Sequence, residues 1–159
     1  MAENRVIGKD NAMPFNVKGN LARFKEITTG HPCVMGRKTW ESLPKKPLPG
    51  RLNIIISKTM KLKESAQSSG DTDNIKIFES IPDALEFCKD HKKIFICGGE
   101  SIYRQTLAFA DKIDLTVVAG QCEGDAFFPE IGDNWKKADT VSYNDFIVVN
   151  YVRINQEQK

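Results

Sequence analysis

The chain has 159 residues, 40% of them hydrophobic and 28% charged, with a formal net charge of +2. This length suits one domain, and the composition is too apolar for a disordered protein. The small charge gives no argument for nucleic-acid binding, no apolar stretch approaches the roughly 20 residues that span a bilayer, and the first residues lack a signal-peptide pattern. We therefore expect one cytoplasmic domain, spanning residues 1–159, that binds neither nucleic acid nor membrane.

Four cysteines are spread along the chain without a C-x-x-C pair, at Cys33, Cys88, Cys97 and Cys122. Only two histidines are present to complete a metal site, so we expect no bound metal. Cys33 and Cys97 lie within apolar runs, where a free thiol behaves as a small core residue. We expect both to be buried, reduced and structural.

Helical and strand patterns alternate along the first two thirds of the sequence. Apolar spacing predicts a helix over 20–27, and Thr39 can cap a helix that begins near Trp40. Ser80 can cap a further helix that continues from Asp83 to Lys89. Short apolar or β-branched runs predict strands over 33–35, 52–57, 75–78 and 94–97.

The rest of the chain predicts a helix over 100–109, a strand over 112–118, and a hairpin of 137–143 and 146–154 that turns at Asn144-Asp145. Residues 44–50 and the polar stretch 58–74 read as loops, the latter including a solvated, functionally silent segment over 65–74. Strands that alternate with helices of about ten residues indicate an α/β fold. We expect a mixed, mostly parallel central sheet with flanking helices and a C-terminal antiparallel hairpin.

Three predicted strands end in turns that suit phosphate groups. Residues 36–39 (GRKT) place two cations and a hydroxyl where a strand leads into a helix, and residues 57–59 (SKT) add another cation. Gly98-Gly99 would let the backbone approach a ligand closely. Each turn alone is also explained as an ordinary solvated strand end, but together they favour a ligand with several phosphates, such as a dinucleotide.

A second group of candidate residues is apolar and lies at loops and helix ends. It comprises Met13, Phe15, Leu21, Phe24 and Leu43. Ordinary core packing is the competing explanation, particularly for Leu21 and Phe24. Arg51 is harder to explain by packing, because a guanidinium at the mouth of an apolar cleft suits a carboxylate.

The motifs that carry these residues resemble dihydrofolate reductase along nearly the whole chain from Arg5 onward. The matching segments are RVIG (5–8), NAMP (11–14), Leu21-x-x-Phe24-Lys25, MGRKTWES (35–42), PLPGR-x-N (47–53), Gly98-Gly99-x-x-Ile102-Tyr103, Leu115-Thr116 and Glu123-Gly124-Asp125-x-x-Phe128-Pro129.

This resemblance implies reduction of 7,8-dihydrofolate to tetrahydrofolate by hydride transfer from NADPH, in a monomer that also binds antifolates. It assigns catalysis to Asn20, Phe15, Thr116 and Met13. It assigns substrate binding to Asn20, Leu21, Phe24, Lys25, Leu43, Leu48, Arg51, Cys97, Tyr103 and Thr116, with Arg51 on the glutamate α-carboxylate. It assigns cofactor binding to Ile7, Gly8, Asn11, Ala12, Gly36, Arg37, Lys38, Thr39, Ser57, Lys58, Cys97, Gly98, Gly99, Glu100, Ser101, Ile102, Tyr103 and Ala126.

The chain departs from the family pattern at its candidate proton-transfer site. The family has an acidic residue where this chain has Asn20, and a tryptophan in place of Phe15. An amide can hydrogen-bond the pterin but has no titratable proton to promote protonation at N5. We therefore expect a slow reductase whose rate rises toward acidic pH. Upstream of Arg5, where the family has an apolar central strand, this sequence has only Met1 to Asn4.

Two alternatives remain at this point. The first is a catalytically degenerate protein that binds NADPH or folate without turnover, which Asn20 would favour. The second is a reductase of the same fold that acts on a riboflavin precursor. Arg51 argues against the second, because that substrate has no glutamate tail.

Overall fold

The computed structural model describes residues 1–61 and 72–154, which form two compact units. We call Ala22–Ile102 the central unit, and Met1–Leu21 together with Tyr103–Lys159 the terminal unit. The predicted loop over 65–74 lies for the most part outside the described residues, and the expectation of a single domain stays a prediction. No helix in the described ranges is both long and apolar enough to span a bilayer.

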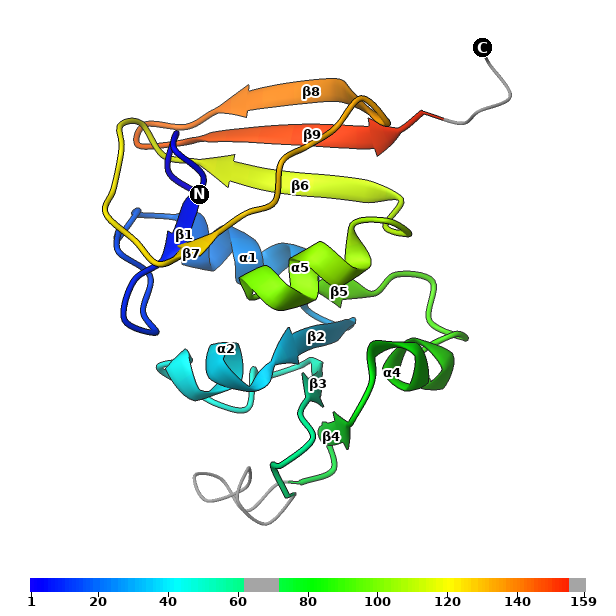
Figure 1. Ribbon diagram of the computed structural model, residues 1–159. Coiled ribbons are helices and arrows are strands. Elements are labelled where there is room, and N and C mark those ends of the chain that lie inside the picture. Colours follow the sequence, from blue (N-terminus) through cyan, green and yellow to red (C-terminus); the bar gives the residue numbers. More distant parts are fainter. Residues whose placement is uncertain (62–71, 155–159) are drawn as a thin grey trace. The chain divides into compact units, whose positions relative to one another are not determined.

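The central unit is built on a parallel sheet of four strands in the order β4-β3-β2-β5 (Figure 1). The strands are β2 (Pro32–Gly36), β3 (Leu52–Ile56), β4 (Ile75–Phe78) and β5 (Phe95–Ile96). Its helices are α1 (Asn20–Thr28), which begins in the terminal unit, then α2 (Arg37–Ser42) and α4 (Ile81–Phe87). In-register pairing of β2 with β3, from Pro32↔Leu52 to Gly36↔Ile56, brings the carboxyl ends of these strands to one edge.

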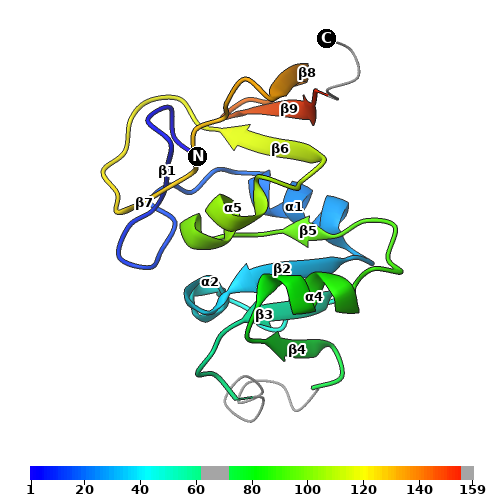
Figure 2. The ribbon, with the colours of Figure 1, turned by 45° about the vertical axis from the view of Figure 1, so that its right-hand side comes forward.

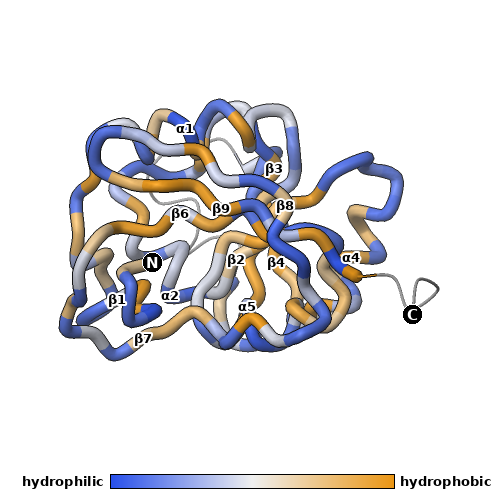
Figure 3. Tube along the Cα trace, turned by 90° about the horizontal axis from the view of Figure 1, so that it is seen from above, coloured by the Kyte–Doolittle hydropathy of each residue, from blue (hydrophilic) through white to orange (hydrophobic). Residues whose placement is uncertain are grey.

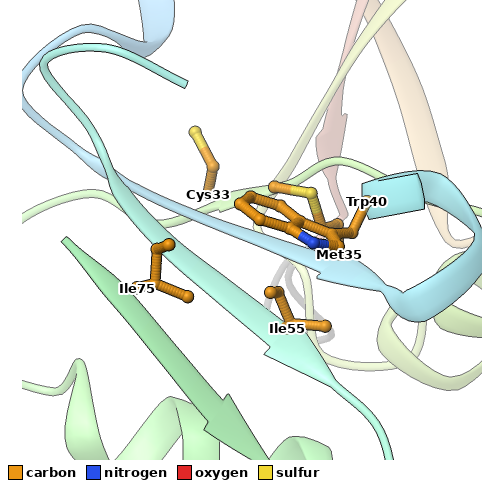
Figure 4. Close-up of a cluster of buried hydrophobic side chains, with 5 residues drawn as sticks. All are labelled: Cys33, Met35, Trp40, Ile55 and Ile75. Carbon is orange, nitrogen blue, oxygen red and sulfur yellow. The ribbon is translucent and has the colours of Figure 1, made fainter. Parts of the chain in front are cut away.

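Alternate residues of β2 and β3 build a separate core on each face of this sheet, as the period of two in a strand requires. One cluster contains Cys33, Met35, Trp40, Ile55 and Ile75 (Figure 4). The other contains Val34, Ile54, Ala84 and Cys88. Trp40 of α2 therefore covers one face of the sheet, and Ala84 of α4 covers the other face. Figure 2 shows α4 beside β3 and β4.

The terminal unit contains an antiparallel sheet in the order β6-β9-β8 and a separate pair, β1-β7. The strands are β1 (Val6–Gly8), β6 (Lys112–Val117), β7 (Ala126–Phe127), β8 (Trp135–Ser142) and β9 (Ile147–Arg153). The helix α5 (Glu100–Thr106) begins in the central unit and ends in the terminal unit. Orange stretches along β9 in Figure 3 mark its apolar residues, of which Val148 and Val149 are buried. Ahead of β1, Met1 accepts a hydrogen bond from Val118 N through its carbonyl, at 2.9 Å.

The predicted fold class is confirmed, including the C-terminal hairpin, whose turn is closed by Tyr143 N donating to Phe146 O at 2.8 Å. The capping prediction for Ser80 is also confirmed, since its Oγ accepts from Asp83 N at 3.3 Å. The prediction for Thr39 was wrong: α2 begins at Arg37, directly after β2, and Gly36 is its N-cap without a side-chain bond. The helix that begins at Glu100 ends at Thr106 rather than at Phe109.

Candidate functional site

In the terminal unit, the fold brings Asn20 and Thr116 together although they are 96 residues apart. Asn20 is the first residue of α1, and its backbone N–H donates to Val17 O at 3.2 Å. The Thr116 hydroxyl, on β6, donates to Asn20 Oδ1 at 3.0 Å. This bond fixes the orientation of the amide, and both side chains remain half-buried. The pair offers hydrogen bonds to a ligand but no titratable carboxyl group.

The candidate loop that follows β1 is a tight turn. Lys9 and Ala12 exchange two backbone hydrogen bonds of 2.8 and 2.9 Å, with Asp10 and Asn11 at φ values of 49° and 60° between them. Positive φ at both central residues is the geometry of a type I′ turn. Asp125 anchors the turn, because its Oδ2 accepts from Asp10 N at 3.0 Å and its own N–H donates to Gly8 O at 3.0 Å.

The other predicted residues of the terminal unit differ in exposure. Gly8 pairs with Ala126 across β1 and β7, so these two candidates do lie together. Phe15 packs against the cluster of Val17, Phe146 and Val148. Met13 is 50% exposed and Leu21 is 57% exposed. The core-packing alternative is therefore wrong for Leu21, whose side chain is available to a ligand.

In the central unit, Arg51 is a buried cation with only 5% of its surface exposed. Its Nη1 donates to Thr28 Oγ1 at 3.2 Å and its Nε to Pro49 O at 3.0 Å, and its Cζ lies 5.8 Å from the centre of the Phe24 ring. No carboxylate of the described residues lies within salt-bridge distance of Arg51. Because a buried charge is costly without a counterion, this guanidinium is suited to an anionic ligand.

Leu43 and Leu48 are partly buried against the core cluster that contains Trp40. The fully buried Asn53 holds Leu48: its Oδ1 accepts from Leu48 N at 2.8 Å, and its Nδ2 donates to Leu48 O at 3.1 Å. Asn53 and Thr28 are positioning residues, a role that the sequence patterns did not predict. Asn53 does belong to the family motif over 47–53. The predicted binding residue Lys25 is exposed.

Three candidate segments lie at the carboxyl ends of neighbouring parallel strands: Gly36 ends β2, Ser57 follows β3 and Cys97 follows β5. Gly36 N donates to Gly98 O at 2.9 Å, and Gly98 has a φ of 104° that favours glycine. A Cβ on Gly36 would lie 3.2 Å from Ile102 Cγ1, and one on Gly99 would lie 3.3 Å from Thr39 Oγ1. An added side chain at either glycine would therefore press on a neighbouring side chain at this sheet edge.

Cations and hydroxyls surround these glycines in the sequence. Lys38 and Lys58 are exposed, whereas Arg37 pairs with Glu41 at 2.7 Å and donates to Thr59 Oγ1 at 2.9 Å. Ser57 is buried and its Oγ accepts from Met60 N at 3.0 Å, so it shapes the turn after β3. Glu100, Ser101, Ile102 and Tyr103 form the first turn of α5, where Ile102 is buried and the ring of Tyr103 lies 5.0 Å from that of Phe128.

The model of the dihydrofolate reductase family matches residues 1–153. This chain belongs to that family. A dihydrofolate reductase of Neisseria gonorrhoeae is 43% identical over 139 residues, which cover 87% of this chain and 81% of the relative. A dihydrofolate reductase of Bacillus subtilis is 39% identical over 137 residues, which cover 86% and 76%. A bifunctional dihydrofolate reductase-thymidylate synthase of Paramecium tetraurelia is 42% identical over 109 residues, 68% of this chain and 22% of that longer protein.

Membership of the dihydrofolate reductase family makes this chain an oxidoreductase enzyme. That the protein binds no metal stays a prediction. Within residues 1–61 and 72–154, no group of three or more His, Cys, Asp or Glu side chains is arranged to hold a metal ion.

Proposed function

We propose that this chain reduces 7,8-dihydrofolate to tetrahydrofolate with NADPH, slowly at neutral pH and faster in acid. The observation that carries the substrate assignment is Arg51, a buried guanidinium that no described carboxylate neutralises. A planar guanidinium binds a carboxylate through two parallel hydrogen bonds, and dihydrofolate carries such a group on its glutamate tail. Phe24, Leu43 and Leu48 would then contact the rings of the substrate.

NADPH binding is supported by the position of Gly36, Gly98 and Gly99 at the carboxyl ends of β2 and β5, the edge of a parallel sheet at which ligands bind in α/β folds. Arg37, Lys38 and Lys58 would supply positive charge to the phosphates of the cofactor, and Thr39 and Ser57 would supply hydroxyl groups. NADPH, when bound, supplies the hydride for the reduction. Its proposed contacts in the terminal unit are those of the Lys9–Ala12 turn and Ala126.

The proton that accompanies the hydride is the step that Asn20 affects. Thr116 Oγ1 donates to Asn20 Oδ1, so the amide N–H groups of Asn20 are left to hydrogen-bond the pterin. Neither group can release a proton at neutral pH, so the proton would come from solvent. Asn20 and Thr116 thus orient the pterin, and solvent acidity sets the rate.

The test measures NADPH oxidation with dihydrofolate from about pH 5 to 8 for the wild-type chain and for Asn20→Asp. General acid–base catalysis typically contributes about 10²–10⁴-fold, so we expect Asn20→Asp to raise the rate at pH 7 by at least about 100-fold and to flatten the acid preference. Asn16→Asp, at an exposed site in the same segment, is the control for added negative charge. Equal rates for wild type and Asn20→Asp at pH 7 would contradict the proton-limited mechanism.

The comparison between variants is needed because a second group titrates in this pH range. The Met1 amine donates to Thr116 O at 2.6 Å, and burial lowers its pKa to about 6. NADPH binding without turnover in either protein would favour the alternative of a degenerate binding protein. Monomeric state, cytoplasmic location and antifolate binding stay predictions.

A further inference from the structure

Arg37, in the central unit, is held by hydrogen bonds from two separate segments. It is the first residue of α2 and follows β2 directly. Its Nε donates to Glu41 Oε1 at 2.7 Å, one turn further along the same helix. Its Nη1 donates to Thr59 Oγ1 at 2.9 Å, in the turn that follows β3. The proposed function uses Arg37 as a phosphate ligand but gives Thr59 no role.

The position of Thr59 is set by the buried residue Ser57. The strands β2 and β3 end in register, so Arg37 and the turn over 57–60 leave the sheet at the same edge. Ser57 Oγ accepts from Thr59 N at 3.3 Å and from Met60 N at 3.0 Å, which closes the turn on itself. Thr59 is exposed, but its backbone is tied to an anchor inside the protein. Its hydroxyl is therefore a fixed acceptor for Arg37.

This bond joins Arg37 to a turn that carries a second cation. Lys58, the residue before Thr59, is exposed. Glu41 offsets one of the two positive charges, but the side chains of Arg37 and Glu41 are 50% and 41% exposed, and ion pairs this exposed contribute little. The group keeps a net positive charge and suits a multiply charged anion. A phosphate monoester carries about −1.5 to −2 at neutral pH.

NADPH and NADH differ by one such group, the monoester phosphate on the adenosine ribose of NADPH. Both cofactors also carry a pyrophosphate. In the sheet order, β2 lies between β3 and β5, so the turn over 57–60 is about two strand spacings, roughly 10 Å, from Gly98-Gly99. The bond to Thr59 holds Arg37 on the β3 side, which suits a phosphate other than one bound at these glycines.

We propose that Thr59 is a positioning residue whose hydroxyl holds Arg37 for the monoester phosphate and thereby sets the preference for NADPH over NADH. The inference rests on the proposed function, because it takes NADPH as the cofactor. A long, exposed side chain loses rotamer freedom when it binds a ligand, and a guanidinium that is already held loses less. Thr59 is neutral, so it holds the cation without offsetting its charge as Glu41 does.

The experiment measures equilibrium binding of NADPH and of NADH to the full chain by titration calorimetry. Thr59→Val keeps the shape and charge of the side chain but removes the hydroxyl. We expect it to weaken NADPH binding by about 3–10-fold, the usual range for one hydrogen bond, and to leave NADH binding unchanged. Thr59→Ser, which retains the hydroxyl, should bind NADPH nearly as wild type does. Thr140→Val, at an exposed site on β8, is the control for the same substitution elsewhere.

A double-mutant cycle separates positioning from direct contact with the cofactor. In the Arg37→Ala background, Thr59→Val should have no further effect on NADPH binding, because Thr59 acts through Arg37. A loss that persists in this background would overturn the proposal, since Thr59 would then bond the cofactor itself. Equal losses for NADPH and NADH, or unchanged NADPH binding in Thr59→Val, would also overturn it and leave the proposed function intact. Failure of the wild-type chain to bind NADPH would overturn both.

Discussion

Arg51 depends on a neighbouring hydroxyl for its position, and this dependence can be tested without changing its charge. Thr28 Oγ1 accepts from Arg51 Nη1 and donates to Phe24 O at 2.6 Å. We expect Thr28→Val to raise the KM for dihydrofolate by about 10-fold, equivalent to about 1.4 kcal/mol, with kcat unchanged. Steady-state kinetics measures both constants.

Thr29→Val is the matched control for this prediction. The Thr29 hydroxyl makes the same kind of bond to the carbonyl four residues earlier, Lys25 O, at 2.5 Å, but it is exposed and has no bond to Arg51. Thr29→Val should therefore leave the KM unchanged. A KM that rises equally in both variants would show a general effect on α1 rather than an effect on Arg51.

Gly124 occupies a position that admits no side chain. A Cβ added there would overlap Val6 Cγ1 and lie 2.6 Å from Gly8 O, a backbone atom that cannot move away cheaply. We expect Gly124→Ala to lower the free energy of unfolding by about 1–3 kcal/mol, the usual cost of overpacking. Gly132→Ala, where nothing lies within 4 Å, should change it little. Chemical denaturation measures both, and equal stabilities would contradict the prediction.

At the scale of elements, the start of α4 depends on one side chain. Ser80 Oγ accepts from Asp83 N, which satisfies one of the free N–H groups at the helix start. Ser80→Ala should cost about 1 kcal/mol of stability, and Ser80→Thr, which keeps the capping oxygen, should cost clearly less. Thermal unfolding compares the two. A loss in Ser80→Thr as large as in Ser80→Ala would argue against capping as the cause.

Elements were predictable from sequence where their signals are local. Ser80 predicts the start of α4 correctly, because an N-cap oxygen bonds a backbone N–H only two or three residues further along the chain. The prediction that Thr39 caps a helix failed because α2 follows β2 directly, with Gly36 as an N-cap that has no side chain. The strands β1 and β7 have three and two residues, which is too short for a period of two to be visible.

At the scale of each whole unit, burial predicts the order in which backbone amides open. Val34, Ile54 and Ile55 of the parallel sheet are fully buried, whereas nearly every residue of the edge strand β8 is exposed. We expect hydrogen exchange to be slowest in β2 and β3 and much faster in β8. Native-state exchange followed by NMR measures this, with β9 as the internal comparison for β8. Equal protection in β8 and β3 would contradict it.

Long-range contacts set the limit of prediction from sequence. No local pattern joins Asn20 to Thr116 or Thr28 to Arg51, because these pairs meet only when the chain folds. The family resemblance placed Asn20, Thr116 and Arg51 among the candidates, but it gave no partner within the chain for Arg51. The role of Asn53 could not be predicted for a physical reason. An amide inside an apolar strand is unfavourable unless it is hydrogen-bonded, and its bonds to Leu48 are visible only in the structure.

The strand order β6-β9-β8 also has a consequence for synthesis on the ribosome. The middle strand of this sheet is β9, the last of the three to be made, so β6 and β8 have no shared neighbour until residues 147–153 emerge. Residues 1–21 belong to the same unit and must wait at least for β7, with which β1 pairs, while the contiguous segment 22–102 can complete its own contacts earlier. A nascent chain stalled before β9 would therefore hold a finished central unit and an incomplete β6-β9-β8 sheet.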